Sequence, residues 1–429
     1  MTATRTGPGS GRGSVVVGTA ARYDPAPGDV PGSHPVTSAP QEPARPHTIG
    51  VAVVGAGWMG HLHARAHLRL AHHWPELPVR PRLVVVADPV ATAREDAVAR
   101  YGFARSTADW RDVLTDPEVD VVSVTAPNAL HREIGVAVAE AGKHLWIEKP
   151  VGLTVADARA VADAVAAAGV CATVGFNYRQ VPAVARARQL IADGALGAVR
   201  HTRVRLLTDY AASPAGSLTW RFQTAQGGTG VLGDLAVHGV DLVRFLLGEV
   251  GEVVADTERF IRQRPLAAEG ASQFDTVVGG PTGEVENDDH VSFLARTVAG
   301  SMVFLEASRV AVGKQNDYGF EVHGDRGFLA WDFRRPAELV VCAGEGHTDR
   351  FATTTTSVPG DGVFARFQPG AGNGLGFDDT KVAECAAFLT GVLAGRSGGA
   401  TPADAVAAAE VLAAVGTSVA TRAWSPVRG

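Results

Sequence analysis

The sequence predicts an α/β protein in which a doubly wound parallel sheet is followed by an α+β region with an open, mainly antiparallel sheet. Between residues 47 and 176, short apolar runs alternate with helical stretches, the order expected of a parallel sheet. A glycine-rich turn joins the first apolar run to the first helix. After residue 176, apolar residues recur with a period of two, which is typical of antiparallel strands with one covered face. We therefore divide the chain into a tail (1–46), a first domain (47–176) and a second domain (177–429).

The composition argues against several classes of function. The chain has 429 residues, 46% of them hydrophobic, which is enough for two or three domains with large cores. Its net charge is 39 − 45 = −6 without a long basic block, so we expect no nucleic-acid partner. We expect no apolar stretch to reach transmembrane length, and therefore no membrane partner. The cysteines Cys171, Cys342 and Cys385 are scattered, which indicates buried thiols in a reducing cytoplasm.

Residues 1–46 differ from the rest in composition. They are rich in Gly, Pro, Ser, Thr and Ala and contain few large apolar residues. Such a segment cannot bury enough apolar surface to offset its loss of conformational entropy, so we predict a disordered tail. It also lacks the apolar core of a signal peptide. A tail that binds a partner is the alternative.

The first domain begins with the apolar run 49–54, which suits a central parallel strand. The glycine-rich turn 55–60 follows, and then a helical stretch that extends to about His73. A proline-containing excursion at 71–82 precedes a second buried strand at 83–87. Further strands are predicted at 119–124, 143–147 and 171–175, and helices at 91–100, 130–141 and 154–168.

The turn Gly55-Ala56-Gly57-Trp58-Met59-Gly60 has the spacing of a dinucleotide-binding loop and lies between a strand and a helix, as that loop requires. Gly55 permits the tight turn, Gly57 lets the backbone approach a pyrophosphate, and Gly60 lets the helix pack closely. Asp88 ends the next strand and is the candidate acceptor for the adenosine ribose hydroxyls. A carboxylate there repels a 2′-phosphate, so NAD is favoured over NADP. A strand-end carboxylate without a ligand is the alternative.

Five histidines lie on the first predicted helix: His61, His63, His67, His72 and His73. His63 and His67 share a face because they are four residues apart. No carboxylate or cysteine is placed to complete a metal site with them. We expect these histidines on a solvated or partly packed face, and we predict no metal.

The second domain begins with a predicted helix at 181–193. Strands are predicted at 199–207, 252–262, 290–296, 301–308, 318–323 and 326–332. Val291, Phe293 and Ala295 share one face of their strand, and polar residues lie on the other. A long connection rich in Gly and Thr covers 344–376, and helices at about 378–394 and 403–421 close the chain.

Lys149 and the segment Asp234–His238 are the candidates for catalysis. Lys149 follows the apolar run 143–147, so it lies at the carboxyl end of a parallel strand, where ligands bind. A helix would place Asp234 and His238 on one face, where the carboxylate can orient the imidazole. A histidine can accept a hydroxyl proton near neutral pH, and a lysine cation can stabilise an alkoxide. This set predicts the oxidation of an alcohol by a nicotinamide cofactor. A solvated Asp–His pair is the alternative.

With three motifs, the chain resembles the glucose–fructose oxidoreductase and inositol dehydrogenase family, also called Gfo/Idh/MocA. The motifs are the glycine turn, Glu148-Lys149-Pro150 and Asp234-x-x-x-His238, and the resemblance covers about residues 47–425. It implies a Rossmann dinucleotide-binding domain, a second α/β domain that binds substrate, and assembly into a homodimer or homotetramer. It also implies NAD, or less often NADP, as the cofactor and a carbohydrate or cyclitol as the substrate.

The resemblance implies roles for individual residues. Lys149 would hydrogen-bond the reacting oxygen, His238 would be the acid/base, and Asp234 would support His238. The cofactor would contact Trp58 and Met59 of the glycine turn, and further along the chain Thr125, Ala126, Pro127, Asn128, His131, Glu148 and Lys149. The substrate would contact Lys149, Asp234 and His238, together with the polar candidates Asn177, Tyr178, Arg221 and Asp241. A purely structural role is the alternative for each of these last four.

Two further segments, Glu-Asn-Asp-Asp at 286–289 and the run 307–313, are similar to the family branch that contains levoglucosan and glycoside 3-dehydrogenases. The expected function is the NAD-dependent oxidation of a secondary hydroxyl of a sugar, anhydrosugar or inositol. The alternatives are an NADP-dependent sugar reductase in natural-product biosynthesis, a glycosidase that uses NAD transiently, and a regulator that senses dinucleotides. A regulator would not need Lys149, Asp234 and His238 together.

Overall fold

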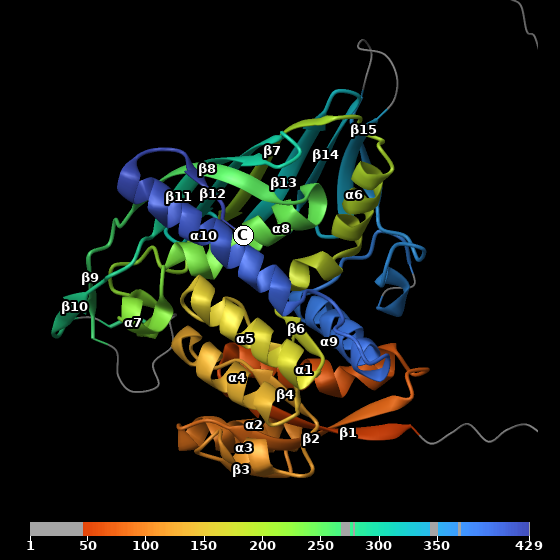
Figure 1. Ribbon diagram of the computed structural model, residues 1–429, viewed down its shortest axis with the longest axis vertical. Coiled ribbons are helices and arrows are strands. Elements are labelled where there is room, and N and C mark those ends of the chain that lie inside the picture. The colour runs from red at the N-terminus through yellow and green to blue at the C-terminus, as the bar shows by residue number, and fades with distance from the viewer. Residues whose placement is uncertain (1–45, 267–274, 278, 344–350, 368–369, 429) are drawn as a thin grey trace, which may run out of the picture. The chain divides into compact units, whose positions relative to one another are not determined.

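The computed structural model describes residues 46–266, 275–277, 279–343, 351–367 and 370–428. The predicted disordered tail therefore lies outside the described residues, apart from Pro46. Within the described residues, the first sheet has six parallel strands in the order β3-β2-β1-β4-β5-β6 (Figure 1). This is the strand order of a doubly wound dinucleotide-binding fold. The predicted α/β fold class is confirmed.

The elements of the first sheet follow the predicted alternation of strands and helices. Its strands are β1 (His47–Val54), β2 (Val79–Ala87), β3 (Arg105–Thr107), β4 (Val121–Val124), β5 (His144–Ile147) and β6 (Ala172–Val174). The helices between them are α1 (Trp58–His73), α2 (Ala91–Tyr101), α3 (Asp112–Thr115), α4 (His131–Glu140) and α5 (Val155–Ala168). Two short elements, β3 and α3, were not predicted from the sequence.

β1 shows why these strands are apolar without alternation. Ile49, Val51 and Val53 belong to a core shared with α1, whereas Ala52 and Val54 belong to the core on the opposite side of the sheet. Both faces of the sheet are therefore covered, and every residue from Ile49 to Val54 is buried.

The predicted excursion at 71–82 is shorter than expected, because β2 already begins at Val79. Pro81 lies inside this strand, opposite Ile49 of β1. It is tolerated because β3 pairs only with Val85–Ala87, so the side of β2 next to Pro81 is a sheet edge.

The second sheet has nine strands within the described residues, in the order β16-β15-β14-β13-β7-β12-β11-β8-β17. Neighbouring strands are antiparallel except β7 and β12. The strands are β7 (Val199–Leu207), β8 (Val250–Glu258), β11 (His290–Thr297), β12 (Met302–Ser308), β13 (Asp317–Gly324), β14 (Gly327–Asp332), β15 (Glu338–Ala343), β16 (Thr353–Thr356) and β17 (Ser425–Pro426). The expected alternation is confirmed in β11, where Val291, Phe293 and Ala295 are buried.

Smaller elements complete this part of the chain. A two-stranded ribbon pairs β9 (Gln263–Pro265) with β10 (Thr282–Glu284). The helices are α6 (Pro182–Ala192), α7 (Thr224–Gly227), α8 (Val237–Leu247), α9 (Phe377–Leu393) and α10 (Pro402–Thr421), and single 3₁₀ turns are η1 (Asn128–Leu130), η2 (Asn177–Gln180), η3 (Trp220–Phe222) and η5 (Phe364–Arg366). The connection predicted at 344–376 lies partly outside the described residues, and its described part contains β16 and η5.

The last two helices return to the first sheet. α9 packs beside α1, and α10 lies between β8 of the second sheet and α5 of the first (Figure 1). α10 is also long and apolar enough, by length and composition, to cross a membrane, so the expectation that no stretch meets this criterion was wrong. One face of α10, with Ala408, Val411 and Val415, is buried against the rest of the protein.

The segment before α8 departs from the predicted regular helix. Leu232–Ala236 (η4) form a π-helical turn, and α8 starts only at Val237. A π turn closes its hydrogen bonds between residues five apart, so residues four apart are not stacked as they are in an α-helix. Asp234 lies in this turn and His238 lies in α8. Their side chains are therefore not stacked as they would be in a regular α-helix.

Candidate active site

The glycine turn between β1 and α1 fits a dinucleotide. Gly55 has a φ of +98°, and a Cβ there would lie 2.7 Å from the backbone of Thr125. A Cβ on Gly60 would lie 2.0 Å from the carbonyl oxygen of Gly55, so the helix packs directly on the turn. Gly57 is the N-cap of α1, and a Cβ there would meet nothing within 4 Å. The first turn of α1 has no acidic residue and no side-chain cap, which suits a phosphate at its N-terminus.

Asp88 lies beside this turn, directly after β2. Its Oδ2 accepts a hydrogen bond of 2.7 Å from the backbone N–H of Ala56, and its Oδ1 accepts one of 2.9 Å from Val90. The carboxylate is thus held at the carboxyl end of the sheet, next to the glycine turn. Its role toward the ribose stays a prediction.

A cleft of about 640 Å³ brings together residues of both sheets. It is lined by thirteen of the residues that the sequence singled out: Trp58, Met59, Thr125, Ala126, Asn128, His131, Glu148, Lys149, Asn177, Tyr178, Arg221, Asp234 and His238. The predicted residues Gly55, Gly57, Gly60, Asp88 and Pro127 are not among those that line it. Four of these five belong to the glycine turn and its neighbouring strand end, where the adenosine and pyrophosphate of a dinucleotide would lie.

Lys149 and Asp234 form the charged centre of the cleft. The Lys149 Nζ donates a 2.8 Å hydrogen bond to the backbone carbonyl of Asp234 and lies 3.6 Å from its Oδ1. The same carboxylate accepts hydrogen bonds from Tyr210 (2.6 Å) and Arg221 (3.3 Å). Burial alone would raise the pKa of Asp234, but Arg221 and Lys149 hold it well below its usual range. Burial lowers the pKa of Lys149, and the negative charge of Asp234 partly opposes this shift.

His238 is buried at the start of α8, beside the ring of Tyr178 at a centroid distance of 4.9 Å. Its Nδ1 has no hydrogen-bond partner among the described residues. Burial, followed by the charge of Lys149, lowers the pKa of this imidazole well below 6.5. The ring is therefore neutral at pH 7.

The expectation that Asp234 orients His238 through a shared helical face was wrong. Among the described residues, Asp234 uses its carboxylate for Tyr210, Arg221 and Lys149, and no hydrogen bond joins it to His238. The physical reason is the π-helical turn that separates them. Asp234 therefore contacts the lysine directly and reaches the imidazole only as a nearby charge, which opposes the lowering of its pKa.

The segment after β4 borders the cleft on the side of α1. His131 lies with both ring nitrogens 2.7 Å from carbonyl oxygens, those of Pro150 and Ala126. It thereby ties this segment to the loop that carries Lys149. Asn128 donates to the carbonyl of Gly227 at 3.3 Å, which links the segment to the loops of the second sheet.

Asn177 and Tyr178 come from the 3₁₀ turn η2 that follows β6. Asn177 is buried and donates a 2.7 Å hydrogen bond to Thr380 Oγ1 of α9. The ring of Tyr178 packs edge-on against Tyr318, Phe333 and Phe377. Packing therefore accounts for much of the environment of both residues.

The two segments that suggested a family branch hold Arg221 in place. Asn287 donates to the backbone carbonyls of Arg221 (2.9 Å) and Gly228 (3.1 Å). Arg309 donates to Asp289 (2.8 Å) and to Asn287 Oδ1 (2.9 Å), and both members of the Arg309–Asp289 pair are buried. None of these three residues lines the cleft. These motifs therefore shape the cleft through the loop that carries Arg221.

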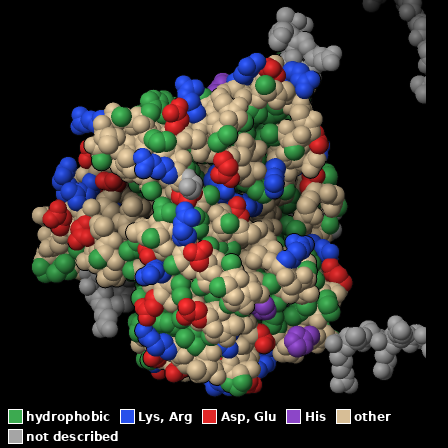
Figure 2. Space-filling view, viewed as in Figure 1, with side chains coloured by type: hydrophobic (Ala, Val, Ile, Leu, Met, Phe, Trp, Pro, Cys, Tyr) green, Lys and Arg blue, Asp and Glu red, His purple; other side chains and the backbone are tan. Residues whose placement is uncertain are grey.

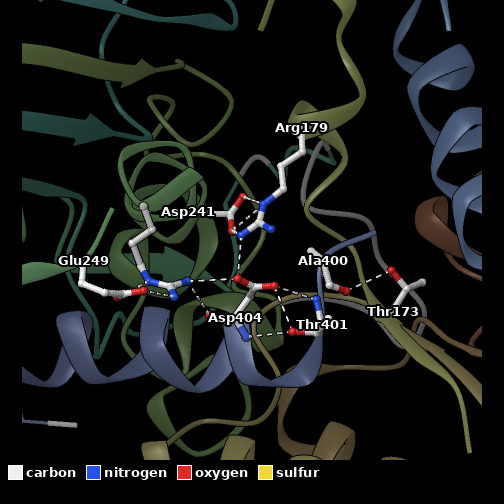
Figure 3. A network of polar contacts seen from close by, with 8 residues as sticks. Thr173, Arg179, Asp241, Glu249, Ala400, Thr401 and Asp404 are labelled. Atoms are coloured by element: carbon white, nitrogen blue, oxygen red, sulfur yellow. Dashed lines mark hydrogen bonds and ion pairs between the residues drawn. The ribbon is translucent and has the colours of Figure 1, made fainter. Parts of the chain in front are cut away.

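Asp241 does not face the substrate, contrary to expectation. It is buried, and Arg179 binds both of its oxygens. Arg179 also pairs with Asp404 at the start of α10, and Arg244 joins Asp404 to Glu249 (Figure 3). We call Arg179, Asp241, Arg244, Glu249 and Asp404 the buttress network. It ties η2, α8 and α10 together behind the cleft.

His63 and His67 are fully buried and not on a solvated face. His63 stacks on Trp146 at a centroid distance of 3.7 Å, and its Nε2 lies 3.0 Å from Glu148. His67 lies 3.1 Å from Ser123 Oγ. Burial lowers their pKa values to about 4 and about 3, so both rings are neutral at pH 7.

Sequence reasoning did not assign several residues that line the cleft: Thr208, Asp209, Tyr210, Trp220, Gln315, Asn316, Tyr318, Phe333, Phe377, Asp378 and Lys381. Most of them lie on loops, where sequence patterns say little about position. Lys381 carried a usable signal. It lies with Glu384 in a mostly apolar helix, and charged residues at such positions are rarely buried without a partner.

Charged side chains of both signs are interspersed over the face of the molecule shown in Figure 2.

Comparison with known proteins places this geometry in a family. Residues 49–176 match the family model described as an oxidoreductase family with an NAD-binding Rossmann fold, and residues 184–330 match a Gfo/Idh/MocA C-terminal domain. A levoglucosan dehydrogenase of Pseudarthrobacter phenanthrenivorans is 37% identical over 389 residues, covering 88% of this chain and 98% of the relative. An inositol 2-dehydrogenase of Rhizobium meliloti is 30% identical, covering 70% of this chain and 81% of the relative.

Solved structures agree with the sequence relatives. The structure of a levoglucosan dehydrogenase in complex with NADH and levoglucosan has a TM-score of 0.83 and 34% identity, covering 89% of this chain and 100% of the other. The complex with NADH and L-sorbose has a TM-score of 0.84 and 35% identity, covering 89% and 99%. Together with the glycine turn and the charged cleft, these matches show that the chain belongs to the Gfo/Idh/MocA family of NAD-binding oxidoreductases, as an enzyme that acts on CH–OH groups.

Proposed function

We propose that the protein oxidises a secondary hydroxyl of a sugar, anhydrosugar or inositol to the ketone, with Lys149 and His238 as the catalytic groups. The observation that carries this proposal is the convergence of a partly buried lysine, a buried neutral histidine and a partly buried carboxylate in one cleft beside the glycine turn. A levoglucosan dehydrogenase with 37% identity supports an anhydrosugar as the first substrate to test.

NAD, when bound, supplies the hydride acceptor. The residues of the chain manage the proton and the charge on oxygen. The Lys149 ammonium stabilises the alkoxide that develops as the hydroxyl loses its proton. His238 is neutral, so it can accept that proton. Asp234 holds the Lys149 Nζ in position and favours its charged form.

The cleft also suits a neutral polyol. Its side away from the glycine turn is lined mostly by residues that offer hydrogen-bonding groups: Tyr210, Trp220, Arg221, Gln315 and Asn316. Trp220 lies against the Arg221 guanidinium at 4.6 Å and adds an apolar wall for the C–H face of a sugar ring. A cytoplasmic location and a homodimer or homotetramer are further parts of the proposal.

The experiment is a panel of levoglucosan, inositols and hexoses with NAD, followed by NADH absorbance. We expect at least one of these substrates to reduce NAD. A panel in which NAD is never reduced, at any pH from 6 to 10, would contradict the proposal.

Cofactor choice is tested in the same assay. If Asp88 accepts the ribose hydroxyls, NAD should be preferred over NADP by on the order of 10-fold or more, which corresponds to about 1.4 kcal/mol. Asp88→Ala should narrow this preference. Equal use of NAD and NADP by the wild-type protein would remove the role assigned to Asp88.

A further inference from the structure

A second set of buried charges lies at the α1 side of the cleft, where Trp58, Met59, Thr125 and Ala126 border it. Its members are Glu148, Lys381 and Glu384, which we call the cleft triad. Lys381 Nζ donates to Glu148 Oε1 and to Glu384 Oε2, the latter at 2.8 Å. Glu148 and Lys381 line the cleft, whereas Glu384 lies behind them.

The triad is enclosed by α1, β5 and α9. All three residues are nearly inaccessible to solvent. The indole Nε1 of Trp146 donates a 3.1 Å hydrogen bond to Glu384, and His63 lies against Glu148. Charges that are buried at this depth cost several kcal/mol each unless they are paired, as in general for ion pairs removed from water.

The charges in the triad do not balance. Two carboxylates share one ammonium, and the neighbouring histidines His63 and His67 are neutral. The ionised triad therefore has a net charge of 1 − 2 = −1. On the loop side of the cleft the balance is reversed, because Lys149 and Arg221 share the single carboxylate of Asp234. The cleft is thus negative on the α1 side and positive on the loop side.

We propose that Lys381 and Glu384 are positioning residues that hold Glu148 at the cleft, and that the surplus carboxylate of the cleft triad makes the protein select the oxidised, cationic nicotinamide over the reduced, neutral one. This inference rests on the proposed function only in taking NAD as the cofactor. The oxidised cofactor supplies the positive charge that the triad lacks, and the reduced cofactor does not.

The protonation of Glu384 follows from the same imbalance. Burial raises the pKa of Glu384 to about 7, against the opposing charge of Lys381. Burial would also raise the pKa of Glu148, but Lys381 and His63 hold it below its usual range. In the absence of cofactor, Glu384 is therefore partly protonated at neutral pH. Binding of the oxidised cofactor should release this proton, so its affinity should rise with pH between about 6 and 8.

The groups that face Glu384 and its partners come from six segments. They are His63 and His67 of α1, His131 of α4, Trp146 of β5, Glu148 and Lys149 of the loop after β5, His238 of α8, and Lys381 and Cys385 of α9. Among the described residues in this set, only Glu384 is assigned a pKa near 7. Its substitution is therefore the direct way to remove the pH dependence.

The test measures the Kd values of NAD⁺ and NADH by protein fluorescence, without any sugar, for the wild type and Glu384→Gln. Glutamine keeps hydrogen-bonding groups for Lys381 and Trp146 but cannot become negative. We expect Glu384→Gln to weaken NAD⁺ relative to NADH by on the order of 10-fold at pH 8, and to flatten the pH dependence of NAD⁺ binding. A structural defect would weaken both cofactors alike.

Asp241→Asn is the matched control, because it removes a buried, arginine-paired carboxylate of the buttress network that does not line the cleft. The ratio of its Kd for NAD⁺ to its Kd for NADH should equal that of the wild type. If Glu384→Gln does not fold, Glu148→Gln removes a negative charge from the same triad and should likewise weaken NAD⁺ relative to NADH.

A folded Glu384→Gln or Glu148→Gln variant with the wild-type ratio of the Kd values for NAD⁺ and NADH would overturn the inference. It would leave the proposed oxidation standing. A changed ratio in a protein that oxidises none of the sugars would support the inference and overturn the proposed substrate class. If the wild type binds neither cofactor, both the inference and the proposed function are wrong.

Discussion

The cleft triad and the buttress network solve the same physical problem in two places. Each buries carboxylates around a cation, and in each, burial raises the pKa of one carboxyl, to about 7 for Glu384 and to about 6 for Asp241. Fully ionised, the buttress network carries the same formal charge as the triad, 2 − 3 = −1, but it has two arginines, and its third carboxylate, Glu249, is exposed to solvent. The cleft triad has one cation, and two of its members line the cleft.

A buried ion network takes on a functional role when its unbalanced charge lies where a ligand can reach it. Behind the cleft, the arginines satisfy the carboxylates and hold three elements together, which is a structural role. At the cleft, the unbalanced charge is available to a ligand. Substitutions in the buttress network should lower the free energy of unfolding. Substitutions at the cleft should change the reaction rate or the ligand selectivity.

The largest expected effect is in the cleft. His238→Ala should lower kcat by roughly 10²–10⁴-fold, the range for losing a general base, while the free energy of unfolding changes far less than in a buttress variant. Because His238 must be neutral to accept the proton and its pKa lies well below 6.5, the wild-type rate should fall only below that pH. The pH–rate profile of the variant should lack this acidic limb. A variant with wild-type kcat and the same limb would exclude His238 as the base.

The next effect concerns the buttress network. Arg179→Met leaves the buried Asp241 without this partner and Asp404 with Arg244 alone, so the free energy of unfolding should fall by about 3–5 kcal/mol. Urea unfolding followed by circular dichroism measures it. The variant should retain the wild-type ratio of Kd values for NAD⁺ and NADH. A shifted ratio with little loss of stability would show that the two networks are not separate.

Asp234→Asn should have a smaller effect, and one confined to high pH. Asp234 opposes the lowering of the Lys149 pKa by burial, so its neutralisation lowers that pKa further. The ammonium is then lost at a lower pH, and the alkaline limb of the pH–rate profile should move to lower pH, while the acidic limb of His238 moves less. Movement of the acidic limb alone would restore the pairing of Asp234 with His238 that the sequence suggested.

The smallest effects concern stability against pH. Glu384 and Asp241 have folded-state pKa values above their ordinary values of 4.5 and 3.8. Each therefore contributes stability that is complete below its ordinary pKa and is lost as pH rises through the folded value. Between about pH 4.5 and 7, Glu384→Gln should lose less unfolding free energy than the wild type does. Asp241→Asn should differ from the wild type mainly below pH 6. If both variants differ from the wild type over the same pH range, the folded-state pKa values assigned to Glu384 and Asp241 are wrong.

Much of the fold was predictable because local patterns and burial agree. β7 was predicted with its bounds, Val199–Leu207, since its alternation is regular. The run after β1 was predictable because the turn requires glycine at Gly55, which packs against Thr125, and at Gly60, which packs against Gly55. The predicted convergence of Lys149 and His238 in a cleft was also correct. The short elements β3 and α3 were missed because β3 is polar and mostly exposed and α3 is a single turn with one buried residue, so neither shows the apolar pattern of the buried strands.

The sequence by itself determined the two kinds of sheet, the dinucleotide turn and the identities of the catalytic candidates, because these depend on local periodicity and on residue types at fixed spacing. Only the tertiary structure decided how the charges pair. It placed Asp234 on Lys149 through a π-helical turn, Asp241 on Arg179, and Lys381 between Glu148 and Glu384 across 233 residues of chain. Burial makes each of these pairings necessary, and burial is a property of the packed molecule and not of any segment.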